Sequence, residues 1–187
     1  MTEAGICACT IRCSVLVVAV ISILLYFALR PATFVIETEV FIHRPAEDVY
    51  KGLSDLRNSI TYHRHRKELH VIEENKDGIP EKVYEITDYI PIYGSLEIPI
   101  TYNVTMEFTK PNRELRCDFS INAYALIGRN TWYLLPGEDQ NGSGTRLKEE
   151  FEITCPWMSS HFTEYTARLA HNDLLSNIKV ALEQRVI

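Results

Sequence analysis

The sequence predicts an α+β protein: a curved antiparallel sheet of about seven strands wrapped around a long C-terminal helix, with two short helices after the first strand and one N-terminal transmembrane helix. Three patterns predict this fold class. Residues 15–29 form an uncharged apolar run, every second residue of 98–108 is apolar, and residues 160–185 contain neither glycine nor proline.

The composition limits the classes of protein to which the chain can belong. Its 187 residues, 46% hydrophobic and 24% charged, are enough for one domain of ordinary size. This composition excludes collagen-like, disulfide-framework and wholly disordered chains. The formal net charge of -6 at pH 7 argues against a general nucleic-acid binder.

Residues 14–30 are predicted to anchor the chain in a membrane, behind a short tail of residues 1–13. As a helix, the apolar run itself reaches only ~22 Å against a hydrocarbon core of ~30 Å, and the flanking residues lengthen it. A cleavable signal peptide is the rival interpretation, but it needs small residues before the cut, and Tyr26 with Ala28 is a poor pair. A short anchor favours a thin membrane such as the endoplasmic reticulum. Residues 31–187 then form one tethered domain.

The side of the membrane on which the domain lies stays open, because basic residues on the two flanks of the anchor are nearly balanced. Asn103 and Asn141 begin glycosylation signals, which matter only in a lumen. Cys117 and Cys155 give no obvious disulfide pair, which favours a reducing cytosol. Three cysteines just before the apolar run are candidates for palmitoylation: Cys7, Cys9 and Cys13.

The spacing of apolar residues predicts the first strands and helices of the domain. The β-branched and aromatic run over 34–42 predicts a strand. Pro45 then opens a short helix, and a second short helix is expected over 55–62. Strands are expected near 69–74 and 82–89, on either side of a turn signal.

The later elements have clearer patterns. Residues 98–108 predict a long strand with one buried face, and the same alternation returns over 115–123. Residues 127–135 and 145–154 predict a hairpin. The long helix over 160–185 is the only predicted element large enough to cover the apolar face of the sheet.

Two parts of the sequence, one near each end of the domain, resemble those of a known family. They are Ile36–Tyr50 with Leu53–Asp55, and Gly144–Leu147 with Phe151–Ile153 and Leu174–Lys179. Over about residues 34 to 185 the chain resembles the START/Bet v1-like superfamily (SRPBCC), the polyketide cyclase/dehydrase and lipid-transport group. Many members place a tryptophan shortly after the aspartate of the second helix, where this chain has Asn58–His63. The resemblance implies a helix-grip fold around a hydrophobic cavity, used mostly to bind or carry lipids and other apolar ligands.

The motifs of the common catalytic and metal sites are missing from the sequence. It contains no Gly-x-Ser-x-Gly elbow, no Gly-rich phosphate loop and no Cys-x-x-Cys pair. The spacing of His63 and His65 is compatible with metal binding on a strand, but the basic neighbours Arg64, Arg66 and Lys67 would repel a cation. We therefore predict no metal and no cofactor, and interpret residues 63–67 as a solvated loop or as a patch for anionic lipid headgroups.

Alternation and helical spacing also predict the cavity. Glu149 shares its parity with Leu147 and Phe151, so its carboxylate is expected inside, within reach of Arg129, unless a β-bulge turns it outward. His171 lies on the apolar stripe of the last helix, as a core histidine or as a ligand-contacting group. The predicted cavity residues are Tyr102, Val104, Met106, Phe108, Leu115, Phe119, Ile121, Arg129, Glu149 and His171.

The connection over 89–100 is unusually apolar for a loop. Its side chains either fold back into the core or form a lid or membrane-facing lip at the cavity mouth. The candidate lid residues are Ile90, Ile92, Tyr93 and Leu96.

Three functions compete at this level. The leading hypothesis is a membrane-anchored domain that binds or transfers a hydrophobic small molecule, above all a lipid, without catalysis. The second is a cyclase/dehydratase-type enzyme that uses His171 or Glu149 as its general acid/base. The third is a scaffold or interaction domain whose interior is filled by its own side chains. The identity of the ligand and the oligomeric state stay open.

Overall fold

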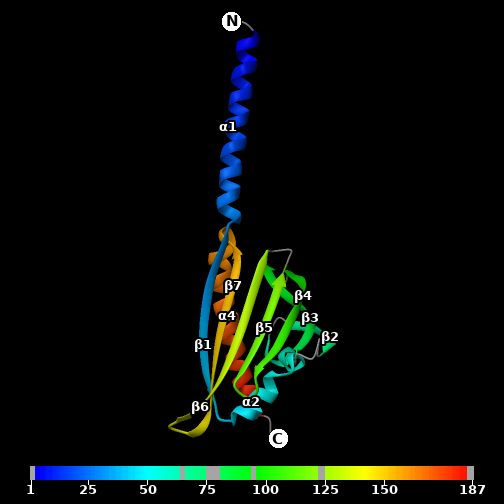
Figure 1. Ribbon diagram of the computed structural model, residues 1–187, viewed down its shortest axis with the longest axis vertical. Helices are drawn as coiled ribbons and strands as arrows, with labels where there is room; N and C mark the ends of the chain where they lie inside the picture. Colours follow the sequence, from blue (N-terminus) through cyan, green and yellow to red (C-terminus); the bar gives the residue numbers. More distant parts are fainter. Residues whose placement is uncertain (1–2, 64–65, 75–80, 94–95, 122–124, 185–187) are drawn as a thin grey trace.

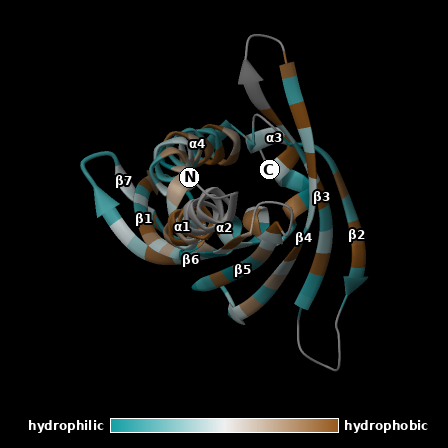
Figure 2. Cartoon of the chain, turned by 90° about the horizontal axis from the view of Figure 1, so that it is seen from above, coloured by the Kyte–Doolittle hydropathy of each residue, from teal (hydrophilic) through white to brown (hydrophobic). Residues whose placement is uncertain are grey.

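The computed structural model describes residues 3–63, 66–74, 81–93, 96–121 and 125–184, with the side chains of 3–14 and 91–93 outside the description. A seven-stranded antiparallel sheet, in the order β1-β7-β6-β5-β4-β3-β2, wraps around the long helix α4 (Figures 1 and 2). The helices are α1 (Glu3–Leu29), α2 (Ala46–Leu53), the 3-10 turn η1 (Leu56–Asn58), α3 (Ser59–Tyr62) and α4 (Trp157–Gln184). The strands are β1 (Pro31–Ile42), β2 (Arg66–Glu74), β3 (Glu81–Tyr93), β4 (Leu96–Lys110), β5 (Glu114–Ile121), β6 (Leu126–Asp139) and β7 (Gly142–Pro156).

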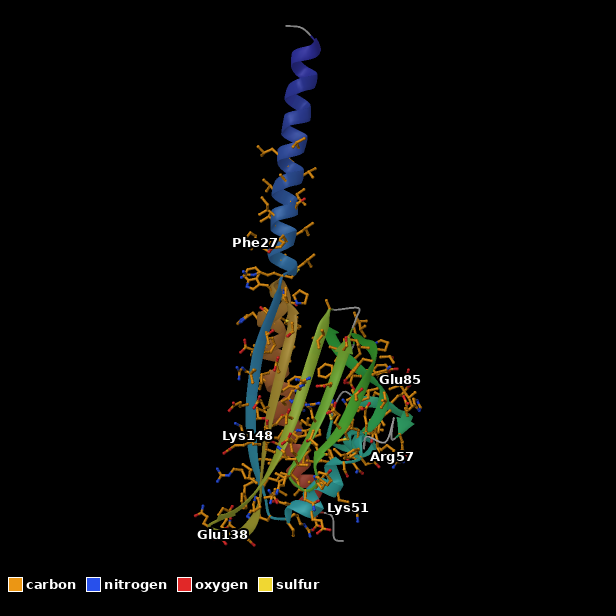
Figure 3. All side chains as sticks on the ribbon, in the orientation of Figure 1. Phe27, Lys51, Arg57, Glu85, Glu138 and Lys148 are labelled. Carbon is orange, nitrogen blue, oxygen red and sulfur yellow. The ribbon has the colours of Figure 1, made fainter. Side chains whose placement is uncertain are left out.

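The core lies between the concave face of the sheet and the C-terminal half of α4. On that half, Leu174, Leu175, Ile178 and Leu182 are buried. Strand alternation turns the opposite residues outward, and Figure 3 shows charged side chains such as Lys148 on the outer surface. The predicted α+β class and the long covering helix are therefore confirmed.

The N-terminal half of α4 packs less completely. None of its residues is buried, and its outward face carries exposed apolar side chains. These are Met158, Phe162, Tyr165 and Leu169. The apolar interior of the domain consequently lies toward the second half of the helix, where α2 and α3 also pack.

The helix α2 closes one end of the sheet against α4. A Cβ atom at Gly52 would overlap the end of the Leu182 side chain, so the glycine lets α2 pack closely on α4 without displacing that side chain. Val49 and Leu53, one turn apart on α2, are both buried and supply its apolar face. This packing positions α2, η1 and α3 as a cover over the sheet.

The helix α1 extends away from the domain, in line with β1 (Figure 1). Where the side chains are described, no helix is long and apolar enough to cross a membrane. The anchor over 14–30 is thus not shown and stays a prediction, and Cys7, Cys9 and Cys13 lie outside the described side chains.

Specific contacts join α1 to the domain. The backbone N–H of Trp157 donates to the carbonyl oxygen of Arg30 over 2.9 Å. The Arg30 guanidinium lies 5.5 Å from the ring centre of Trp157 and 5.9 Å from that of Phe27, which is a cation–π arrangement. The start of β1 and the start of α4 are therefore joined directly beneath α1.

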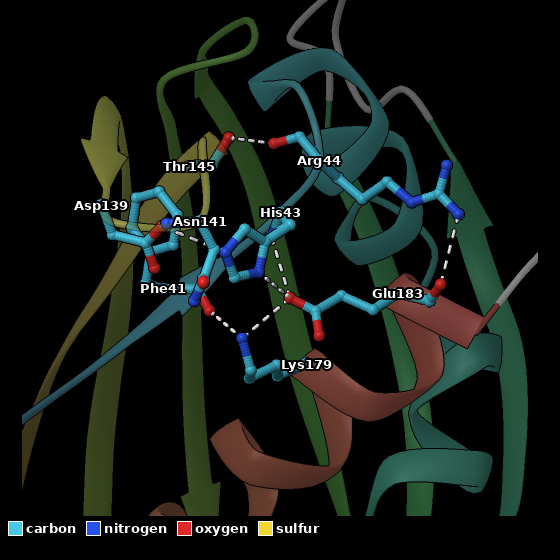
Figure 4. Close-up of polar contacts among 8 residues, drawn as sticks. All are labelled: Phe41, His43, Arg44, Asp139, Asn141, Thr145, Lys179 and Glu183. Atoms are coloured by element: carbon cyan, nitrogen blue, oxygen red, sulfur yellow. Dashed lines mark hydrogen bonds and ion pairs between the residues drawn. The ribbon is translucent and has the colours of Figure 1, made fainter. Parts of the chain in front are cut away.

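At the opposite end, a polar network fastens α4 to β1 and to the β6–β7 turn (Figure 4). The two ring nitrogens of His43 lie 3.0 Å from Oε1 of Glu183 and 3.2 Å from Oδ1 of Asp139. Lys179 also donates to Oε1 of Glu183 over 2.8 Å. Hydrogen bonds to Glu183 first, and then to Asp139, raise the pKa of His43.

The hairpin between β3 and β4 differs from the prediction. The sequence predicts a connection over 89–100, but both strands continue into it, and Ile90 pairs with Ile98. β-Branched side chains favour this extended pairing although they are unusual for a loop. The β6–β7 pairing also runs on to Asp139 and Gly142, which leaves a two-residue turn.

Candidate functional site

A cavity of about 110 Å³ lies between the concave face of the sheet and α4, beneath α2, η1 and α3. Its walls are mainly apolar, with a few polar groups. Its lining includes the side chains of Arg66, Tyr102, Cys117, Phe119, Asn130, Trp132, Phe151, His171 and Leu174. This combination of an apolar wall and a few convergent polar groups is typical of a small-molecule site.

Glu149 is the centre of the first polar group beside the cavity. Its side chain is fully buried, at 0% exposure. Oε1 accepts hydrogen bonds from Nδ2 of Asn130 over 2.6 Å and from Nε1 of Trp132 over 3.0 Å. Nδ1 of His171 lies 2.9 Å from the same oxygen, and Thr38 donates to Oε2 over 2.9 Å. Strands β1, β6 and β7 and the helix α4 thus converge on one carboxylate.

These contacts hold Glu149 in its charged form. Burial alone raises the pKa of a carboxyl group, but here the positive charge that His171 carries when protonated and the hydrogen bonds from His171, Asn130 and Thr38 outweigh it. The pKa of Glu149 is therefore lowered. An ionised carboxylate only accepts hydrogen bonds, so Nδ1 of His171 is the protonated ring nitrogen facing it.

Arg66 and Asp88 form a second buried group on the other side of the cavity. Their side chains are 10% and 7% exposed, and Nε of Arg66 lies 3.1 Å from Oδ1 of Asp88. The Tyr102 hydroxyl donates to Oδ2 of Asp88 over 2.5 Å, and Nη1 of Arg66 donates to Ser59 over 2.7 Å. Burial raises the pKa of Asp88, but the Arg66 charge and these hydrogen bonds bring it below the ordinary value. Arg66 and Tyr102 thus both donate to Asp88 within the protein.

Aromatic rings connect the two polar groups along the cavity wall. The rings of Phe151 and His171 are stacked with their centres 3.9 Å apart, and those of Phe119 and Phe151 with their centres 5.7 Å apart. The ring of Tyr102 lies 5.7 Å from that of Phe119. Such a wall offers flat apolar contact to a guest.

The cavity offers no reactive thiolate among the described residues. Cys117 lines the cavity, but burial raises its pKa to about 12. A group suited to proton transfer is the imidazole of His171, whose Nε2 makes no hydrogen bond to any residue that the structure describes.

The predicted cavity residues divide into three sets. Tyr102, Val104, Phe119 and His171 line the cavity, and Glu149 lies directly behind its wall. Met106 and Leu115 are fully buried in the core and do not line it. Phe108 and Ile121 are half-buried outside it.

The placement of Arg129 corrects the prediction. Arg129 is exposed and donates to Asp118 over 2.8 Å instead of reaching Glu149. In the β6–β7 register Arg129 pairs with Glu152, while Glu149 pairs with Trp132. Because side chains alternate along a strand, Arg129 faces the outer surface and its neighbour Asn130 faces the cavity.

The structure also corrects the interpretation of residues 63–67 as a patch for lipid headgroups. The buried pairing of Arg66 with Asp88 removes its charge from the surface, while Lys67 is exposed and His63 lines the cavity. Arg64 and His65 lie outside the described residues. Of the lid candidates, Ile90 is half-buried, Leu96 is exposed, and the side chains of Ile92 and Tyr93 lie outside the description.

The sequence reasoning missed Thr38, Asp88, Asn130 and Trp132, all of which hold a buried charge. A signal for two of them was present. Asn130 and Trp132 have the parity of Leu134 on their strand, so a tight turn after Asp139 brings both to the face of Glu149.

Comparison with solved structures identifies the architecture. The Zhui aromatase/cyclase from Streptomyces sp. R1128 matches with a TM-score of 0.67 at 15% identity, over 83% of this chain and 97% of that chain. The chain has the helix-grip fold. A START superfamily protein from Mycobacterium smegmatis matches with a TM-score of 0.64 at 12% identity, over 80% of this chain and 97% of that one. Norcoclaurine synthase from Thalictrum flavum matches with a TM-score of 0.56 at 12% identity, over 82% and 96%.

At these identities the likeness shows the fold alone. No model of a known protein family matches the sequence, and neither does any curated protein. Any conclusion on function therefore depends on the cavity and its side chains.

Proposed function

We propose that this domain binds a small, largely apolar organic molecule in the cavity between the sheet and α4. The observation that carries the proposal is an apolar, ring-lined cavity flanked by the buried Glu149–His171 pair. Its support from the fold is indirect: an aromatase/cyclase and a synthase in complex with a transition state analogue share this architecture.

The size of the cavity limits which molecules it can hold. Pockets for drug-sized ligands measure ~300–1,000 Å³, whereas this one measures about 110 Å³. A whole lipid would require the cover of α2, η1 and α3 to open. The proposal is therefore a molecule smaller than the lipid that the sequence predicts.

Extraction of the purified full chain followed by mass spectrometry tests this proposal. Leu174 lines the cavity and Leu169 lies on the exposed face of the same helix, so Leu174→Phe fills the cavity and Leu169→Phe is its matched control. We expect one compound to co-purify with the wild-type chain and with Leu169→Phe, and to be lost from Leu174→Phe. Equal amounts in all three samples would contradict the proposal.

We further propose that residues 14–30 tether the domain to a thin endomembrane. Support comes from the uncharged run over 15–29 and from the exposure of its large apolar side chains, such as Leu24 and Phe27. Alkaline extraction of membranes from expressing cells tests it. The wild-type chain should stay in the membrane pellet and Leu24→Arg should be released in part, because an arginine at the centre of a span costs ~2.5–3.5 kcal/mol. Release of both chains alike would reject the tether.

Asn103 and Asn141 are both exposed, so either acceptor is accessible to glycosylation in a lumen. The gel mobility of Asn103→Gln and Asn141→Gln then reports on the side of the membrane. A mobility change would place the domain in a lumen.

An acid–base enzyme is the second candidate, and a specific observation favours it. Glu149 orients His171 through Nδ1, and the ring lines the cavity, which is the arrangement of a general base with its orienting carboxylate. In this role the neutral ring of His171, with its proton on Nδ1, takes a proton from the guest at Nε2 and returns it. Incubation of the co-purified compound in deuterium oxide should then incorporate deuterium with the wild-type chain and not with His171→Gln. Absence of exchange with the wild-type chain would remove this candidate.

A further inference from the structure

Asn130 lines the cavity and carries an unused hydrogen-bond acceptor. Its side chain is 7% exposed and donates through Nδ2 to Glu149. The ionised carboxylate has no proton to give, so it fixes the amide with Nδ2 toward itself and Oδ1 away from it. Oδ1 of Asn130 is buried and has no hydrogen-bond partner among the described residues. Buried acceptors are normally satisfied, so this atom indicates a missing donor.

The rest of the wall explains which kind of group is missing. On the opposite side, Nε of Arg66 and the Tyr102 hydroxyl donate to Asp88, and Nη1 of Arg66 donates to Ser59. Near Asn130, the protonated nitrogen of His171 faces Glu149. The site therefore lacks a donor beside Asn130, which a guest in the cavity can supply.

The shape and size of the cavity limit the rest of the guest. An engineered apolar cavity of about 150 Å³ holds one benzene molecule, and this cavity measures about 110 Å³. Phe119, Phe151 and Trp132 supply flat apolar surfaces in its wall. Because this cavity is smaller still, one ring is the upper limit of what it can hold, and a second ring or a long chain does not fit.

We propose that the guest is a single-ring molecule with one hydrogen-bond donor, such as a hydroxyl group on an aromatic ring. The donor is accepted by Oδ1 of Asn130, and the ring packs between Phe119, Phe151 and Trp132. This inference rests on the proposed binding function and specifies its ligand class.

Phenol and toluene are suitable probes because they differ in one group, a hydroxyl against a methyl, at nearly equal size. The full chain contains two tryptophans. Trp132 lines the cavity, and Trp157 is exposed at the start of α4. In the chain labelled with ¹⁵N-tryptophan, the indole signal of Trp132 reports binding and that of Trp157 is an internal control.

Titration with phenol should shift the Trp132 signal, with toluene binding at least about tenfold more weakly, which corresponds to about 1.4 kcal/mol. The preference should disappear in Asn130→Ala. If that variant fails to fold, Leu174→Phe provides the test: it should bind neither phenol nor toluene, whereas Leu169→Phe should bind both.

The outcomes separate the two proposals. Equal affinity for phenol and toluene overturns the inference on the donor but leaves the binding function standing. No response of Trp132 to either probe overturns both. Phenol binding that survives Leu174→Phe also overturns the inference, because the probe then occupies another site.

Discussion

Replacement of Glu149 measures how much the buried carboxylate and its hydrogen bonds contribute to the free energy of unfolding. In Glu149→Leu the carboxylate disappears, and four donors lose their acceptor: Asn130, Trp132, His171 and Thr38. Removing one partner of a buried pair costs ~3–5 kcal/mol, because the remaining groups stay buried and unsatisfied. We expect a loss of this size in the free energy of unfolding.

Glu149→Gln is the matched control, because the amide has the same shape. Its oxygen can take the three contacts at Oε1, and its nitrogen can donate to the hydroxyl of Thr38. Only the charge-assisted part of these bonds is lost, which amounts to about 1–2 kcal/mol. Equilibrium urea unfolding of the full chain should therefore separate the two variants by about 1–4 kcal/mol.

The pH dependence provides an independent check. Since the folded-state pKa of Glu149 is lowered, its contribution to stability is fully present above the ordinary value of 4.5 and is lost as the pH falls through the folded value. The gap between the wild-type chain and Glu149→Gln should thus close in acid. Equal destabilisation by leucine and glutamine, or a gap that does not change with pH, would refute the buried network.

Two further predictions concern the framework of the fold. A Cβ atom at Gly144 would overlap the backbone oxygen of Ile42, so Gly144→Ala should destabilise the domain by about 1–3 kcal/mol, while Gly137→Ala, which meets only an ordinary contact, should stay near the wild-type value. Contacts to Glu183 raise the pKa of His43, so its contribution is complete below the unfolded value of 6.5 and is lost as the pH rises through the folded one. The melting temperatures of the wild-type chain and His43→Gln should differ more at pH 6 than at pH 8.5; a constant difference would show that His43 acts only through packing.

Much of the fold was predictable from local patterns. The strict alternation over 98–108 predicts β4, and the stretch without glycine or proline over 160–185 predicts α4. Both patterns report directly which side chains avoid water. The hairpin over 89–98 was not predictable in this way, because its apolar side chains fit a lid and an extended strand equally well.

The centre of the site was only half predictable. Strand parity places Glu149 inside, and the structure has it fully buried. The choice of Arg129 as its partner was wrong because the diagonal neighbour of Glu149 in this register is Asn130. The contact with His171 depends on the rotation of α4 against the sheet, and that rotation is set by packing over the whole interface, which no local pattern contains.

The energetics of the interior argue against a scaffold whose side chains merely fill the space. A residual cavity costs ~24 cal/mol per Å³, so 110 Å³ of open space corresponds to a loss of about 2–3 kcal/mol. The buried pairs of Glu149 with His171 and of Asp88 with Arg66 give little in return, because apolar residues of similar volume stabilise a core at least as well. The domain therefore keeps an open space and two buried charge pairs at a cost to its own stability. A guest that fills the space and satisfies Asn130 recovers this cost, whereas a partner on the outer surface does not, and this difference favours ligand binding over a purely structural role.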